Sequence, residues 1–307
     1  MATEIVEDVA WSPPEGVTTH AGVPIDPEMD FFEPPPKEIG EVRTASSTLK
    51  VRQNPPSTAV RGAALFGPAA LAIVILHYVA NLTEPIFDII AFLACFGLGW
   101  YFTRFSHTCS YVGKDGVARI RCARQRYRIA KREVFLFRDA QELRTSQTRH
   151  YHNGIYTHTA YNFTWSGPAG KVFKLEGTYR GEKQPPKPKD PFHFAQAGEV
   201  AWSLAVLDRA QAELERDGAI KFRLTGTDWV ALGPGFIDLN LKGQTQRCNA
   251  EEVDGVSIAG GVFKVKRKDA KEGWFRSEGV FQFAYGNMAN ARVFLLALDK
   301  LLGLRFG

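Results

Sequence analysis

Cysteine is scarce in this sequence, and the common catalytic and metal-binding motifs are missing from it. The four cysteines, Cys95, Cys109, Cys122 and Cys248, show no CxxC spacing. That argues against a zinc site or a disulfide framework and favours free thiols in a reducing compartment. No P-loop, HExxH, GxSxG or GxGxxG sequence occurs either. We therefore expect a protein that is not an enzyme and has no cofactor and no metal site.

Charge is distributed in blocks of opposite sign. Residues 1–41 contain ten Asp/Glu and one Lys, a net charge of −9, whereas residues 42–132 contain thirteen Lys/Arg and three acids, a net charge of +10. A basic block usually suggests nucleic acid, but this one surrounds the most apolar part of the chain, which favours a membrane surface. Its most basic stretch holds a single aromatic residue, Tyr127. We therefore expect no nucleic-acid partner.

The N-terminal region is acidic and rich in proline. Residues 1–58 contain nine prolines and no sustained apolar period. Segments of this composition bury too little apolar surface to fold, so we predict a disordered acidic, Pro-rich tail. The start of the chain has no signal-peptide pattern. We also hypothesise that the acidic tail folds back on the basic block and competes with the membrane for it.

Two apolar stretches follow the tail. Residues 63–80 contain no Asp, Glu, Lys or Arg, and residues 86–103 contain only Asp88. Each is close to the roughly 18 to 20 residues that span a bilayer as a helix. Aromatic residues lie near the ends of both stretches, as in membrane proteins. We predict a two-helix transmembrane hairpin over residues 61–104; the alternative is a buried pair of core helices.

Lys and Arg flank the two stretches and are absent from the short loop between them. The positive-inside rule then predicts an integral protein of the cell (inner) membrane with both termini in the cytoplasm. His77 and Asp88 face each other at the outer end of the hairpin. We expect them to reach the interface rather than to relay protons.

The remaining residues alternate strand patterns with turn signals. Two segments have helical spacing instead, residues 194–215 and residues 290–302. Strands are predicted at residues 118–123, 126–130, 133–137, 157–165, 171–179, 220–224, 229–233, 236–241, 262–268 and 280–286.

The strands and helices suggest a duplication, because residues 105–216 and 217–307 each run through several strands to one helix. Residues 171–175 align with residues 280–283 in this repeat. Gly116-Val117 aligns with Trp229-Val230, and Glu133-Val134 with Glu252-Val253.

A two-span hairpin followed by two such modules resembles the bacterial membrane-anchored tandem PH-like (bPH) domain proteins. The stretches that carry the likeness are residues 112–117, 132–137 and 287–303, and it covers residues 60–307. The resemblance implies a membrane α-hairpin plus a mainly-β (α+β) part. That part would hold two PH-like antiparallel β modules, each closed by a C-terminal helix. PH-like folds bind lipids, peptides and proteins alike, so the fold leaves the ligand open.

The strongest chemical feature is a basic segment, residues 119–132, which has seven Lys/Arg and no acid. It begins shortly after the second apolar stretch, so we expect it close to the cytoplasmic leaflet. Each basic residue there contributes about 1 kcal/mol of attraction to an anionic surface. A merely solvated strand face is the alternative reading. The predicted lipid-binding residues are Arg119, Arg121, Arg124, Arg126, Arg128, Lys131 and Arg132.

Three histidines surround an Asn-Gly dipeptide at residues 153–154, a strong hairpin signal. The predicted register pairs His150 with Thr157. It puts His150 and His152 on one face and His158 on the other. Two imidazoles are too few for a metal site, so we interpret them as exposed hairpin residues.

Together these patterns predict a noncatalytic membrane-anchored scaffold or binding protein. Its cytoplasmic modules would contact anionic lipid headgroups or protein partners. The alternative is a structural subunit of a larger membrane complex, and an enzyme acting on lipid or envelope precursors is a third, less supported class. The complex alternative rests on small residues that permit close helix packing. These are Gly67, Ala70, Gly97 and Gly99.

Overall fold

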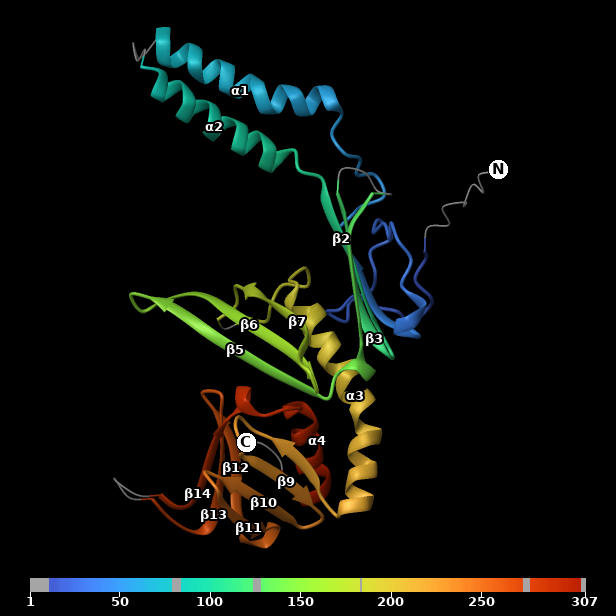
Figure 1. Cartoon of the computed structure of the whole chain (residues 1–307), viewed down its shortest axis with the longest axis vertical. Coiled ribbons are helices and arrows are strands. Elements are labelled where there is room, and N and C mark those ends of the chain that lie inside the picture. The colour runs from blue at the N-terminus through green and yellow to red at the C-terminus, as the bar shows by residue number, and fades with distance from the viewer. Residues whose placement is uncertain (1–10, 79–83, 124–127, 183, 273–276, 305–307) are drawn as a thin grey trace.

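A computed structural model describes residues 11–78, 84–123, 128–182, 184–272 and 277–304. Its class is mixed α+β, as expected, with two long apolar helices projecting from a body of antiparallel sheets (Figure 1). The body has two halves in chain order. Each half contains a four-stranded sheet, a three-stranded sheet and one helix longer than ten residues.

The first half contains strands β1 to β7 and helix α3. Its sheets have the orders β1-β2-β3-β4 and β5-β6-β7. The bounds are β1 Val42–Ser47, β2 Ser106–Gly113, β3 Gly116–Ala123, β4 Ile129–Leu136, β5 Glu142–His152, β6 Ile155–Gly167, β7 Gly170–Tyr179 and α3 Phe192–Asp217.

The second half contains strands β8 to β14 and helix α4. Its sheets have the orders β11-β10-β9-β8 and β12-β13-β14. The bounds are β8 Ile220–Arg223, β9 Trp229–Gly233, β10 Phe236–Leu241, β11 Gln244–Asn249, β12 Val253–Ala259, β13 Val262–Glu272, β14 Ser277–Ala284 and α4 Ala291–Leu302. Four short 3-10 turns complete the chain: η1 Lys37–Ile39, η2 Phe137–Asp139, η3 Ala250–Glu252 and η4 Tyr285–Asn287.

The long helices are inserted between the first two strands of the first half. They are α1, Thr58–Tyr78, and α2, Pro85–Phe102. Across this insertion β1 pairs with β2 in antiparallel register, from Thr44 opposite Val112 to Ser47 opposite Cys109. A module that starts at residue 105 is therefore incomplete, because its edge strand lies before the hairpin.

The order of elements in the two halves corrects the predicted repeat. Residues 171–175 lie in β7 and residues 280–283 in β14, which are counterparts, as predicted. Gly116-Val117 lies in β3, whereas Trp229-Val230 lies in β9, the counterpart of β2. The predicted alignment is therefore shifted by one strand: it left out β1, which corresponds to β8, and so matched β3 with β9 instead of β10.

The disordered tail predicted for residues 1–58 is wrong for residues 11–50; residues 1–10 lie outside the described part of the chain. Ile39 and Leu49 are fully buried, and Phe31 is 2% exposed. Phe31 and Ile39 pack against Tyr111 of β2 and Ile120 of β3. The composition argument failed because the few apolar residues of this segment meet one apolar sheet face. A proline-rich chain can cover such a face in extended form, and Val42–Ser47 at the end of this segment also pairs with β2 as strand β1.

One apolar core runs through both halves. It includes Trp165 and Trp202 from the first half and Phe263 and Phe294 from the second, all fully buried. The 26 residues of α3 span about 39 Å. Figure 1 shows this helix extending from the first half to the second.

The α1–α2 pair is long and apolar enough to cross a membrane. Mean hydropathy reaches 2.0 in α1 and 1.7 in α2, and only 11% and 6% of those apolar windows are buried. So much exposed apolar surface is unusual for core helices of a water-soluble protein. The helices meet closely at Gly99, where any side chain would overlap the carbonyl oxygen of Ala64. Gly67 and Gly97 have open space around them.

Candidate membrane-facing basic site

Strand register places one end of the first sheet beside the helical hairpin. β2 begins at Ser106, four residues after the last residue of α2. Ser106 pairs with Ala123 at the end of β3, and Cys122 pairs with Ile129 at the start of β4. The end of β3 and the start of β4 therefore lie at the hairpin end of the sheet.

The described basic residues of β3 and β4 lie on both faces of the sheet, in the half of these strands that is nearer the hairpin. Arg121 is opposite Lys131 and Arg119 is opposite Glu133, so these four side chains share one face. Arg132 pairs with Ile120 and lies on the other face. Arg121, Arg128, Lys131 and Arg132 are exposed, and Arg119 is half-buried. Arg124 and Arg126 lie outside the described residues.

Two carboxylates neutralise part of this charge. Glu133 accepts a hydrogen bond from Arg119 Nε at 2.7 Å and pairs with Lys131 Nζ at 2.7 Å. Partial burial acts to raise the pKa of Glu133, but Lys131 and Arg119 outweigh it and lower that pKa below its usual value. Arg132 pairs with Glu33 of the N-terminal segment. Sequence reasoning missed both acids; Glu133 directly follows the basic segment, whereas nothing in the sequence points to Glu33.

The N-terminal segment folds back on the sheet, as hypothesised. It contacts the basic segment through apolar packing on Ile120 and through the Glu33–Arg132 ion pair, beside the hydrogen bond that the Tyr111 hydroxyl donates to the Glu33 carbonyl. The apolar packing of residues 11–50 shows that charge is not the main force holding the segment. Its competition with a membrane stays a prediction.

His20 fixes this segment to the sheet. Its Nδ1 lies 2.8 Å from Thr44 Oγ1 and its Nε2 lies 2.9 Å from Ser110 Oγ. Its ring is 5.0 Å from that of Phe194. Burial lowers the pKa of His20 to about 3, so the imidazole is neutral at physiological pH and links two hydroxyls.

A small apolar cluster lies where the hairpin joins the sheet. Leu49 precedes α1, Phe105 follows α2, and both pack with Cys122 of β3. At the end of α2 the Thr103 hydroxyl donates to the Gly99 carbonyl at 2.7 Å. The cluster therefore brings together the chain segments that lead into and out of the hairpin.

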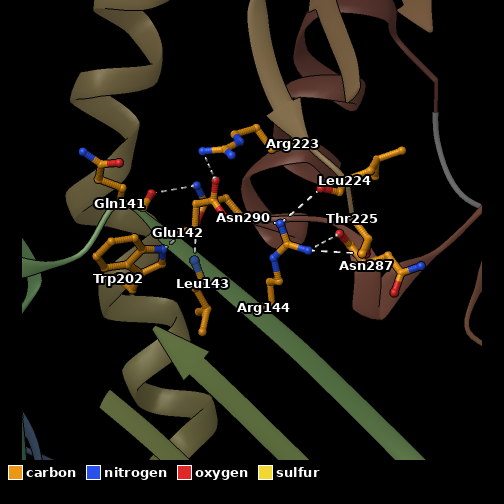
Figure 2. Close-up of polar contacts among 10 residues, drawn as sticks. All are labelled: Gln141, Glu142, Leu143, Arg144, Trp202, Arg223, Leu224, Thr225, Asn287 and Asn290. Atoms are coloured by element: carbon orange, nitrogen blue, oxygen red, sulfur yellow. Dashed lines mark hydrogen bonds and ion pairs between the residues drawn. The ribbon is translucent and has the colours of Figure 1, made fainter. Parts of the chain in front are cut away.

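Polar contacts join the two halves at the far end of the first sheet (Figure 2). Arg144 of β5 donates to the carbonyls of Leu224, at 3.2 Å, and Asn287, at 3.0 Å. Asn290 Oδ1 accepts from the Leu143 amide at 3.0 Å and from Trp202 Nε1 at 2.9 Å. Together with the shared core, these contacts make the halves one body.

The histidine-bearing hairpin differs from its predicted register. A bulge at Thr157 pairs His150 with His158, and the two rings stack with centroids 4.6 Å apart. The predicted pairing of His150 with Thr157 is therefore wrong. Among the described residues, no group of three or more His, Cys, Asp or Glu side chains is placed to hold a metal ion.

Comparison with known proteins adds no assignment. No protein-family model matches the chain, and a search of curated proteins finds no match.

Proposed function

We propose that this chain is a noncatalytic, membrane-anchored binding protein. Helices α1 and α2 cross the cell membrane as a hairpin with both termini in the cytoplasm. Two PH-like β modules then lie on the cytoplasmic side, and the first contacts anionic lipid headgroups through the hairpin end of β3 and β4. The observation that carries this proposal is the strand register: Arg121 lies opposite Thr108, which follows the last residue of α2 by six positions, and Lys131 lies opposite Arg121.

The order of elements supports the PH-like part of the proposal. Several antiparallel strands followed by one helix occur twice in succession, which is the arrangement that the sequence resemblance implies. In the first module the membrane hairpin replaces the connection between the first two strands.

The charge balance sets the strength of the proposed lipid contact. The five described cations minus Glu133 and Glu33 leave a net charge of +3 (5 − 2). At about 1 kcal/mol for each charge, that gives about 3 kcal/mol of attraction before screening. Such a contact orients a tethered module, and because its cations are exposed it weakens as salt rises.

A fluorophore beside the site tests the proposal in the full chain. Ala130 is exposed and lies between Arg128 and Lys131, so a fluorophore can be attached to Ala130→Cys. Lipids that carry a nitroxide on the headgroup quench this fluorophore when the site is close to the headgroups. We expect stronger quenching in nanodiscs with phosphatidylglycerol than in pure phosphatidylcholine, and a loss of this difference at high salt.

Charge reversal supplies the decisive comparison. The double variant Arg121→Glu/Lys131→Glu should abolish the effect of anionic lipid. The matched reversal Lys242→Glu/Lys300→Glu, in the second half, should leave it intact. Equal quenching in neutral and anionic nanodiscs would reject the lipid-contact proposal.

A structural subunit of a larger membrane complex is the second candidate. Gly67 and Gly97 take no part in the packing of α1 on α2, so they leave small-residue positions open to another helix. This alternative predicts that protein extracted from its native membrane migrates well above the monomer mass. That migration would not change with Arg121→Glu/Lys131→Glu.

A further inference from the structure

The β5–β6 hairpin extends beyond the sheet to which it belongs. Its two-residue turn is Asn153-Gly154, with φ values of 49° and 78° that fit a type I′ turn. Pairing of β7 with β6 reaches only to Thr159, opposite Tyr179. Residues 150–158, here called the β5–β6 tip, thus form a two-stranded ribbon with which no third strand pairs in the described part of the chain. An isolated ribbon of this kind is marginally stable in water, so a second surface would stabilise it.

The side chains of the tip combine apolar, aromatic and basic groups. Ile155 is 72% exposed and Tyr151 is 51% exposed. Residues 146–159 include Arg149 and three histidines but no Asp or Glu. The one carboxylate hydrogen-bonded to the tip among the described residues is Glu182, which accepts from the Tyr151 hydroxyl at 3.1 Å. An aliphatic end flanked by tyrosines, with Arg149 next to it, suits the interface of a bilayer.

The direction of the ribbon matches this chemistry. In Figure 1 the β5–β6 tip projects to the same side as α1 and α2 rather than away from them. A chain held in the bilayer by two helices keeps the tip close to the headgroups at all times, so even a weak attraction is effective.

We propose that the β5–β6 tip enters the headgroup region of the bilayer that α1 and α2 cross, with Ile155 deepest. This inference rests on the proposed membrane anchoring and adds a second contact, separate from the basic end of β3 and β4. The absence of acids from the ribbon favours an anionic lipid surface over a basic protein partner.

Site-specific labelling of the full chain in nanodiscs tests the inference. Cys95→Ser removes the half-buried thiol; Cys109, Cys122 and Cys248 are buried, and burial raises the pKa of each thiol, so they resist labelling. A nitrobenzoxadiazole label is then placed at one of three positions. Ile155→Cys probes the tip, Leu93→Cys probes an exposed face of α2, and Val172→Cys probes an exposed position of β7 at the other end of the same sheet.

Quenching by aqueous iodide and by lipid-borne nitroxide separates the outcomes. We expect Ile155→Cys to lose iodide quenching severalfold relative to Val172→Cys and to gain lipid quenching, as Leu93→Cys does. If Leu93→Cys is lipid-quenched while Ile155→Cys behaves like Val172→Cys, the tip proposal is overturned and the anchoring stands. If Leu93→Cys is open to iodide, the anchoring itself fails. Shielding of Ile155→Cys from both quenchers would mean that protein covers the tip, which also overturns the proposal.

Discussion

Replacement of Asn290 gives the sharpest test of the junction between the two halves. Its Oδ1 is the acceptor for the Leu143 amide and for Trp202 Nε1, and both residues are buried, at 2% and 0% exposure. Asn290→Ala leaves two buried donors without a partner, at about 1 to 3 kcal/mol each. The left-handed backbone at this position, φ 55°, adds about 1 kcal/mol for a residue other than Gly or Asn. We therefore expect the junction to lose at least about 3 kcal/mol.

Hydrogen exchange of the full chain in detergent measures this loss locally. A destabilisation of 3 kcal/mol corresponds to exchange that is about a hundredfold faster, and we expect it in segments 141–145 and 287–291. Asn290→Gly relieves the backbone strain but also lacks the Oδ1 acceptor. The exchange rate of residues 141–145 in this variant should therefore lie between the wild-type rate and the Asn290→Ala rate. Asn240→Ala, which removes an exposed amide from β10, is the matched control and should change little.

Unchanged exchange at residues 141–145 in Asn290→Ala would refute the reasoning. It would mean that the shared apolar core alone holds the two halves together and that the polar contacts in Figure 2 contribute nothing measurable.

Three further predictions concern single residues. Because the pKa of His20 is about 3 in the folded chain and about 6.5 in the unfolded chain, the unfolded state binds the proton first; stability should fall by up to about 2 kcal/mol between pH 7 and pH 5. His20→Gln should remove that dependence from urea-unfolding midpoints. Burial raises the pKa of Glu199, so the ionised folded state is disfavoured, and Glu199→Gln should stabilise the chain above the folded pKa, with a gain in urea-unfolding midpoint that is lost as the pH falls through the folded pKa towards the unfolded one. Gly99→Ala should lower the thermal unfolding temperature in detergent because it forces α1 and α2 apart, whereas Gly97→Ala, with open space around it, should not.

Local patterns were sufficient to predict much of the fold. The predicted helix at residues 290–302 is α4, found at Ala291–Leu302, and the two apolar stretches became α1 and α2. Strand β1 could not be predicted in this way, because its sequence, VRTASS, is mostly polar. Its partner β2 begins at residue 106, beyond the whole hairpin, and only tertiary pairing makes the segment a strand.

The candidate site was predictable only in part. The basic segment was predicted to lie at the membrane because it follows α2 closely in sequence; the register shows that it begins at Arg119, in the middle of β3, and runs towards the hairpin end, and its contact with a membrane stays a prediction. The pairing of Arg132 with Glu33 joins residues 99 positions apart, and no local pattern reports such a contact. The bulge at Thr157 likewise depends on how the two strands twist together, so the register of the histidines was missed by one residue.

Placing the hairpin between β1 and β2 ties the folding of the first half to the order of synthesis. Strand β1 leaves the ribosome early but has no partner until both helices have been made and β2 has followed them. If α1 and α2 fail to enter the membrane, β1 and β2 are joined by a long apolar segment that is exposed to water. A fragment that begins at residue 106 would lack both β1 and the segment that covers the sheet, so Cys109, Tyr111 and Ile120 would be exposed. The first sheet is therefore completed only after the whole hairpin has been synthesised, so the N-terminal segment waits for the longest apolar part of the chain before it can fold.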